Sequence, residues 1–237
     1  MEPILLYGFP LGSSAGLVAA FEWLGQPYRL CRVDMLSDIK TEAYVRLNGR
    51  GETPVLITDD GRVLTETTAI AGWLEARDQD HRISFAPGSA ETDRMRQWIG
   101  FVNSSFTGAF SPLWAALEMN PPDPVVQTSL RVFGRKAAAK RQAQLEAMIG
   151  DTRFLVADRP SLADGLLAGV ARWADFHEVW DPRATPRLAE LRGRIESDPA
   201  FVFAQAVEAG DTPAGSGAMA GQVPLEDILA RWAPAAG

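Results

Sequence analysis

The chain has 237 residues, of which 46% are apolar, and a formal net charge of −7 at pH 7. This size allows one or two hydrophobic cores, and the acidic balance argues against nucleic acid or an anionic membrane surface as a main partner. The chain lacks an apolar run long enough to span a bilayer, a basic leader at its N-terminus and a second cysteine beside Cys31, so we expect a cytoplasmic protein with no disulfide framework and no His/Cys metal site.

The first third of the chain alternates between strand and helix patterns. Leu17, Phe21 and Leu24, at positions i, i+4 and i+7, predict an early helix. Asp59-Asp60-Gly61 predicts a hairpin turn, since glycine accepts the positive φ that such turns need. The complete pattern predicts strands over residues 4–7, 28–33, 55–57 and 62–64, and helices over 14–25, 37–47 and 67–76. This order, βαβαββα, indicates a thioredoxin-like α/β domain over residues 1–78.

The periodic segments that follow are helical. Residues 79–90 contain Pro and Gly without periodicity and are interpreted as a linker to an all-helical domain over 91–208. The helices predicted for this domain cover residues 95–106, 125–149, 162–173, 186–196 and 199–208. Residues 209–237 are interpreted as a mobile Gly-rich linker followed by a last helix over 224–232. Two placements of this helix are open: a lid over an active site, or simple packing on the domain.

A pair of serines, Ser13 and Ser14, lies between the first predicted strand and the first predicted helix. Serine is a preferred N-cap, so the simplest interpretation of either residue is structural. The same position also suits chemistry, because the N-terminus of a helix carries partial positive charge and unpaired N–H groups that favour an anion such as a thiolate. A hydroxyl group at this point can donate a hydrogen bond to the sulfur.

Two further short motifs stand at the starts of elements. Thr53-Pro54 precedes the third predicted strand, and most X-Pro bonds are trans. Glu66-Thr67 precedes the third predicted helix, where both residues are typical of helix capping. The Glu66-Thr67 pair also offers an acid for an ammonium group and a hydroxyl with helix N–H groups for a carboxylate.

Taken in order, residues 6–14, 53–56 and 64–70 resemble the thiol-binding half of glutathione S-transferases, of a bacterial serine-type or beta-like kind. An α/β unit followed by a helical unit is also the architecture of that family. The resemblance implies glutathione as co-substrate and a residue that stabilises its thiolate. Ser14 lies where serine-type enzymes carry their catalytic serine and is our first choice. Ser13, where cysteine-type enzymes carry cysteine, is second, and Tyr7, where tyrosine-type enzymes carry tyrosine, is third.

The resemblance also implies the other contacts of glutathione. In the family the proline of Thr53-Pro54 is cis, and the backbone of the preceding residue pairs with the cysteinyl part of glutathione. Glu66 and Thr67 are implied to bind the γ-glutamyl ammonium and carboxylate groups. Thr67 keeps the hydroxyl of the serine that is usual there.

One departure concerns the glycyl end of glutathione. The family often has lysine or glutamine at the position of Glu52, which would repel the glycyl carboxylate. We therefore expect Arg50 or Lys40 to supply the positive charge. Gly49 also replaces a proline of the family pattern.

The electrophile pocket is implied to lie on the first helix of the second domain, which carries Asn103, Phe106, Phe110 and Trp114. Aromatic residues at helical spacing usually belong to a core. Phe110 and Trp114, four residues apart, are our choices for the pocket. Thr107 stands where cysteine-type enzymes have histidine, and Ser13 where they have cysteine, and the two differences together argue against mixed-disulfide chemistry.

The resemblance thus implies a cytoplasmic homodimer that conjugates glutathione to a small apolar electrophile. Two alternatives remain open. One is a glutathione-dependent isomerase or lyase on the same scaffold, in which glutathione is regenerated. The other is a non-catalytic binding module, which Glu52 and Gly49 favour.

Overall fold

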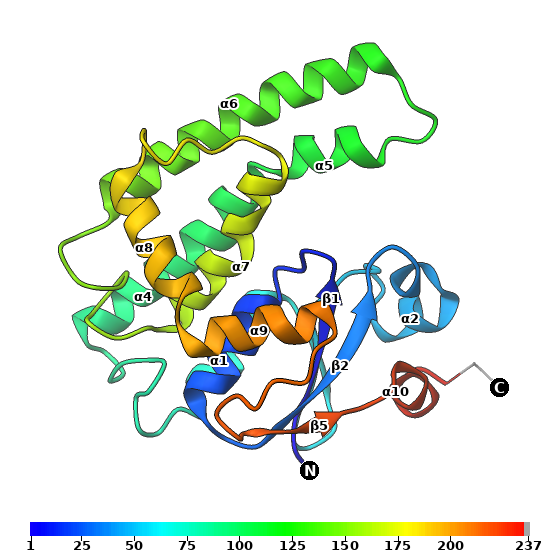
Figure 1. Ribbon diagram of the computed structural model, residues 1–237. Helices are drawn as coiled ribbons and strands as arrows, with labels where there is room; N and C mark the ends of the chain where they lie inside the picture. Colours follow the sequence, from blue (N-terminus) through cyan, green and yellow to red (C-terminus); the bar gives the residue numbers. More distant parts are fainter. Residues whose placement is uncertain (235–237) are drawn as a thin grey trace.

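The computed structural model describes residues 1–234 and shows a five-stranded sheet joined to a bundle of helices (Figure 1). The strands are β1 (Ile4–Phe9), β2 (Tyr28–Asp34), β3 (Val55–Ile57), β4 (Val63–Thr65) and β5 (Met219–Gln222). The helices beside the sheet are α1 (Ala15–Leu24), the short 3₁₀-helix η1 (Asp38–Lys40), α2 (Glu42–Leu47) and α3 (Thr67–Glu75). The predicted thioredoxin-like order βαβαββα is confirmed.

The sheet has the strand order β4-β3-β1-β2-β5. β1 pairs in parallel with β2 and antiparallel with β3, and β3 pairs antiparallel with β4 across the predicted hairpin. The fifth strand was not predicted, since β5 falls within the Gly-rich segment that we expected to be mobile. It pairs in parallel with the free edge of β2, and Val223 N donates to Leu30 O at 2.8 Å. Backbone pairing with an existing edge, rather than side-chain pattern, makes this segment a strand.

The second unit is helical, as predicted. Its elements are α4 (Ala90–Gly100), which continues into a π-helix η2 (Phe101–Phe106), then α5 (Ser111–Glu118), α6 (Pro124–Met148), α7 (Leu162–Phe176), α8 (Pro186–Glu196) and α9 (Pro199–Ala209). The capping box of Ser161 and Asp164 starts α7. No helix within residues 1–234 is long and apolar enough to cross a membrane.

Helix α7 packs closely on α1, and glycines make this contact possible. A Cβ atom on Gly16 would lie 1.9 Å from the carbonyl oxygen of Gly165, and one on Gly169 would lie 2.3 Å from that of Ser13. The backbones of the two helices therefore approach at a distance that side chains do not allow. The start of α1 and the segment before it are in this way placed directly against the helical unit.

The two faces of the sheet are covered by different elements. One face packs with α1, α3 and the helical unit around a large apolar core. The opposite face is covered by α2 and by the last helix, α10 (Leu225–Trp232), around a smaller cluster that includes Leu6, Val33, Tyr44 and Ile228. Trp232 Nε1 donates to Gly61 O at 2.9 Å. Of the two placements open for this helix, packing on the domain is confirmed and the lid is wrong.

Candidate functional site

A small cavity of about 40 Å³ lies between the thioredoxin-like unit and the helical unit. Ser13, which precedes the N-cap residue Ser14 of α1, and Thr67, the first residue of α3, line it from one side. Its other lining residues come from η2 and its end and from α7: Val102, Asn103, Thr107, Leu166 and Val170. Two hydroxyl groups on one side thus face a wall that combines apolar side chains with the amide of Asn103 and the hydroxyl group of Thr107.

The electrostatics of this cavity favour an anion. The N-termini of both α1 and α3 meet there, and neither helix has an acidic residue in its first turn. Each helix start carries about half a positive charge, although the first N–H groups of α1 already donate to the carbonyl oxygens of Gly12, Ser13 and Ser14. Two such ends on one cavity favour a thiolate or carboxylate over a neutral group.

The two serines point in different directions. Ser14 is fully buried, and its Oγ accepts a hydrogen bond from Gly8 N at 2.9 Å. Ser13 is partly exposed and lines the cavity. Our order of preference placed Ser14 first, whereas accessibility favours Ser13. One step along a helix start turns a side chain by about 100°, which directs Ser14 toward β1 and the interior.

The structure also argues against Tyr7, our third choice. Its side chain is buried in the core, and its hydroxyl donates to Val207 O at 2.9 Å. Burial raises the pKa of Tyr7 to about 12. The phenol is therefore occupied by a backbone partner, and Tyr7 is not among the residues that line the cavity, so this geometry gives no support to a catalytic role for Tyr7.

Thr53 lies beside the end of β1. The Thr53-Pro54 peptide bond is cis, and Thr53 Oγ1 donates to Met35 Sδ at 3.3 Å. A Cβ atom on Gly8 would lie 2.3 Å from Thr53 Oγ1, so glycine at that position leaves room for the threonine. Thr53 and the segment that carries Ser13 therefore share the same end of the sheet.

Three charged residues expected to contact glutathione form one exposed cluster. Arg50 Nε lies 2.9 Å from Glu52 Oε2, and Arg50 Nη1 lies 3.5 Å from Glu66 Oε1. Glu66 directly precedes α3 with a φ of 70°, next to Thr67 in the cavity wall. Lys40, at the end of η1, is exposed to solvent. The structure thus brings Arg50 to both carboxylates.

The residues expected to form an electrophile pocket separate into three groups. Asn103 lines the cavity. Phe106 and Phe110 are buried, edge to face, with ring centroids 5.2 Å apart, and neither lines this cavity, so their place in an electrophile pocket stays a prediction. Helical spacing is the same for a core residue and a pocket residue, which is why the sequence did not separate them. Trp114 is half-buried and stacks on Phe176 with centroids 5.4 Å apart.

Four residues of the cavity wall were not among the predicted site residues: Val102, Thr107, Leu166 and Val170. Thr107 follows η2, and its hydroxyl donates to Val102 O at 2.9 Å. The only signal for it was its place in the family pattern, where cysteine-type enzymes have histidine. Leu166 and Val170 are one turn apart on α7 and have the periodicity of ordinary core residues.

The segment before Ser13 is held by the helical unit. Leu11 has a φ of 59°, which is uncommon for a residue with a side chain. Its N–H donates to Glu208 Oε1 at 2.5 Å, and its carbonyl accepts from Trp173 Nε1 at 2.8 Å. Both backbone groups of this residue are therefore bound by α7 and α9.

A thioredoxin-like unit whose helix starts line a cavity against a helical unit defines the glutathione-transferase class of folds. Residues 14–77 match the family described as "Glutathione S-transferase, N-terminal domain". The chain is 28% identical over 173 residues to the glutathione S-transferase GST-4.5 of Xanthomonas campestris pv. campestris, which covers 71% of this chain and 81% of that protein. It is 27% identical over 208 residues to the maleylacetoacetate isomerase of Pseudomonas aeruginosa. This match covers 80% of this chain and 89% of that protein.

Solved structures agree with these relatives. A ternary complex of BphK, a bacterial glutathione transferase, superposes with a TM-score of 0.74 at 28% identity, over 87% of this chain and 99% of that one. Residues 14–77 thus match the N-terminal domain of glutathione S-transferases, and the chain as a whole is similar in sequence and fold to bacterial members of that family.

Proposed function

We propose that the protein binds glutathione at this cavity and conjugates its sulfur to a small apolar electrophile. The observation that carries the proposal is the convergence of Ser13 and Thr67, at the starts of two helices, on one cavity in a fold of this family. Ser13 donates its hydroxyl hydrogen to the sulfur, and the N-terminus of α1 lowers the thiol pKa. The thiolate then attacks an electrophile held on the helical side, and positioning supplies much of the acceleration.

The rest of glutathione is bound by the neighbouring groups. The backbone of Thr53, next to Pro54, pairs with the cysteinyl part, and Glu66 and Thr67 bind the γ-glutamyl end. Arg50, which pairs with Glu52 and Glu66 in this structure, turns to the glycyl carboxylate. Because these ion pairs are exposed, exchanging them for ligand contacts costs little.

The experiment is a calorimetric titration with glutathione of the wild type, of Glu66→Ala and of Glu91→Ala. Glu91 is an exposed acid in the first turn of α4 and serves as the matched control. We expect binding by the wild type and the control and a loss of about tenfold or more in affinity for Glu66→Ala. A wild type that does not bind glutathione would contradict the proposal. The protein would then be a binding module that does not use glutathione.

A second candidate is a glutathione-dependent isomerase. It is favoured by the similarity to the maleylacetoacetate isomerase, which extends over 89% of that protein. In such a reaction the thiolate adds to the substrate and leaves again, so glutathione is regenerated. Mass spectrometry of the products separates the two reactions, since a sulfur-free product with unchanged glutathione identifies the isomerase.

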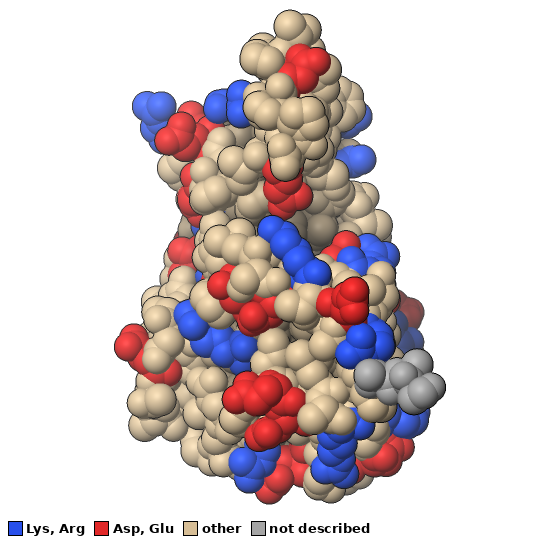
Figure 2. Space-filling model, turned by 90° about the vertical axis from the view of Figure 1, so that its right-hand side faces the viewer, with Lys and Arg blue, Asp and Glu red and all other residues tan. Residues whose placement is uncertain are grey.

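We further propose that the protein is a cytoplasmic homodimer. Apolar side chains are exposed at the projecting end of α5 and α6, and this tip carries few charges (Figure 2). These residues are Leu117, Val125, Val126, Val132 and Phe133. Below the tip, basic and acidic residues are interspersed on the face seen in Figure 2, which supports a protein partner over nucleic acid or an anionic membrane surface. Sedimentation of Phe133→Glu against the wild type tests the dimer, with a shift to monomer expected.

A further inference from the structure

The C-terminal strap, which we define as residues 219–233, returns from the helical unit to the sheet. β5 extends the sheet beyond β2, and α10 then lies beside α2 on the face opposite the helical unit (Figure 1). Ile228 is fully buried, and it belongs to the same apolar cluster as Tyr44 and Leu47 of α2. The strap therefore completes a core that α2 alone covers in part.

On one side, the strap holds the helix that fixes the peptide before Thr53. Arg46 Nε donates to Ala233 O at 3.2 Å, which ties α2 to the end of the strap. The buried Tyr44 donates its hydroxyl hydrogen to Glu52 O at 2.9 Å, and Asn48 Nδ2 donates to the same oxygen at 2.7 Å. Glu52 O belongs to the peptide that leads into Thr53, so two hydrogen bonds set the orientation of this peptide.

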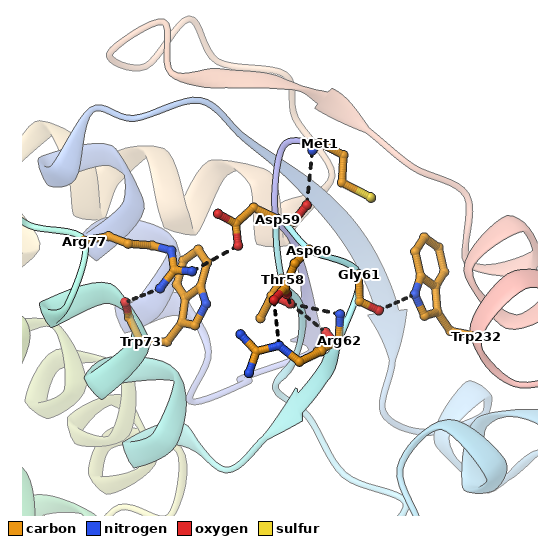
Figure 3. A network of polar contacts seen from close by, with 9 residues as sticks. All are labelled: Met1, Thr58, Asp59, Asp60, Gly61, Arg62, Trp73, Arg77 and Trp232. Atoms are coloured by element: carbon orange, nitrogen blue, oxygen red, sulfur yellow. Dashed lines mark hydrogen bonds and ion pairs between the residues drawn. The ribbon is translucent and has the colours of Figure 1, made fainter.

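On the other side, the strap holds the hairpin that follows Thr53. Trp232 Nε1 donates to Gly61 O in the turn between β3 and β4 (Figure 3). The same turn is tied to other parts of the domain, through Arg77 to Asp59 and through the Met1 ammonium group to Asp59 O. Strand β3 begins directly after Pro54, so the strap is attached on both sides of Thr53.

These attachments matter because the elements around Thr53 are short. β3 has three residues and α2 has six, and elements of this length owe their order to packing rather than to their own hydrogen bonds. We propose that the C-terminal strap is a positioning element that sets the Thr53 backbone for glutathione before the ligand arrives, with Ile228, Trp232 and Tyr44 as positioning residues. The inference rests on the proposed function, and preorganisation of this kind raises affinity by lowering the ordering cost of binding.

The test uses full-length Ile228→Ala and Tyr44→Phe. Tyr44→Phe removes only the hydroxyl that holds Glu52 O, and Ile228→Ala loosens the contact of α10 with α2. The control is Leu188→Ala in α8, an equally buried apolar truncation in the helical unit. Two quantities are measured, the glutathione Kd by calorimetry and the hydrogen exchange of residues 42–54 in the free protein.

We expect both test variants to bind glutathione about three- to tenfold more weakly and to exchange faster over residues 42–54. Leu188→Ala should leave both quantities unchanged, and Ile228→Val should restore most of the affinity. Binding by the wild type with unchanged Kd in both variants would overturn the inference alone. A wild type that fails to bind glutathione would overturn the proposed function, and the inference with it.

Discussion

Arg172 and Glu208 form an ion pair between α7 and α9, with Arg172 Nη1 2.6 Å from Glu208 Oε2, and the same two side chains hold the segment before Ser13. Arg172 Nη2 donates to Gly12 O at 2.8 Å, while Glu208 accepts from Leu11 N. The exposed fractions of the two side chains are 12% and 11%. The helical unit therefore sets the geometry of the loop that carries Ser13.

Removing one partner of this ion pair should strongly lower the free energy of unfolding. Arg172→Met leaves the Glu208 carboxylate largely buried without its cation, and we expect a loss of about 3 kcal/mol in the free energy of unfolding. Arg183→Met is the control, because its pair with Asp181 is exposed to solvent and should contribute no measurable stability. Chemical denaturation measures both. Equal losses in the two variants would show that the buried ion pair contributes no more to the free energy of unfolding than the exposed pair.

The two serines should respond differently to alanine. Ser13→Ala should reduce kcat/KM by about 100-fold, since a preorganised hydrogen-bond donor to the thiolate is removed, with little change in stability. Ser14→Ala should lower the free energy of unfolding by about 1–2 kcal/mol, because the buried Gly8 N–H loses its acceptor.

The pH dependence of the bound thiol, followed by the ultraviolet absorbance of the thiolate, checks the role of Ser13. Its pKa should rise in Ser13→Ala and stay close to the wild-type value in Ser14→Ala. The reverse pattern would show that Ser14, and not Ser13, stabilises the thiolate.

Asp164 predicts a dependence of stability on pH. The carboxyl group is fully buried in the capping box, where it accepts from Leu155 N and Ser161 N. Burial raises its pKa to about 6, although these hydrogen bonds oppose the rise. A group whose pKa is raised in the folded state contributes most below its unfolded pKa of about 3.9, and this contribution is lost as pH rises through about 6.

Comparison with Asp164→Asn, which does not titrate, isolates this contribution. The free energy of unfolding of the wild type, relative to the variant, should fall between about pH 4 and pH 6. Denaturation at a series of pH values measures the difference. A constant difference over this interval would mean that the folded-state pKa of Asp164 is not raised.

The close contact of α1 and α7 predicts a large effect of one methyl group. Gly16→Ala places a Cβ atom 1.9 Å from the backbone of Gly165, and the helices must separate at a cost of about 3 kcal/mol or more. Gly72→Ala in α3 is the control, because nothing lies within 4 Å of the new atom. The control should gain about 0.5–1 kcal/mol from the higher helix propensity of alanine. Thermal unfolding of both variants measures these changes, and a Gly16→Ala variant as stable as the wild type would contradict the prediction.

Local patterns in the sequence were sufficient for most elements of the fold, with β5 and α5 as exceptions. The apolar periodicity of Leu17, Phe21 and Leu24, the turn Asp59-Asp60-Gly61 and the capping box at Ser161 each act over a few residues, and the corresponding elements are present. The order of motifs was also sufficient for the family, because a strand, a serine pair, Thr-Pro and Glu-Thr are spaced along the chain as the family has them. These features depend on short-range geometry, which the sequence contains directly.

Tertiary structure alone decided which side chains face the cavity. Ser13 and Ser14 are adjacent and chemically identical, and only the contact with β1 makes one of them internal. Phe106 and Phe110 have the spacing of pocket residues, yet neighbouring aromatic rings bury them. β5 is a strand because the edge of β2 is free, a condition set by residues about 190 positions earlier in the chain. Burial and strand pairing depend on partners distant in sequence, so no local pattern determines them.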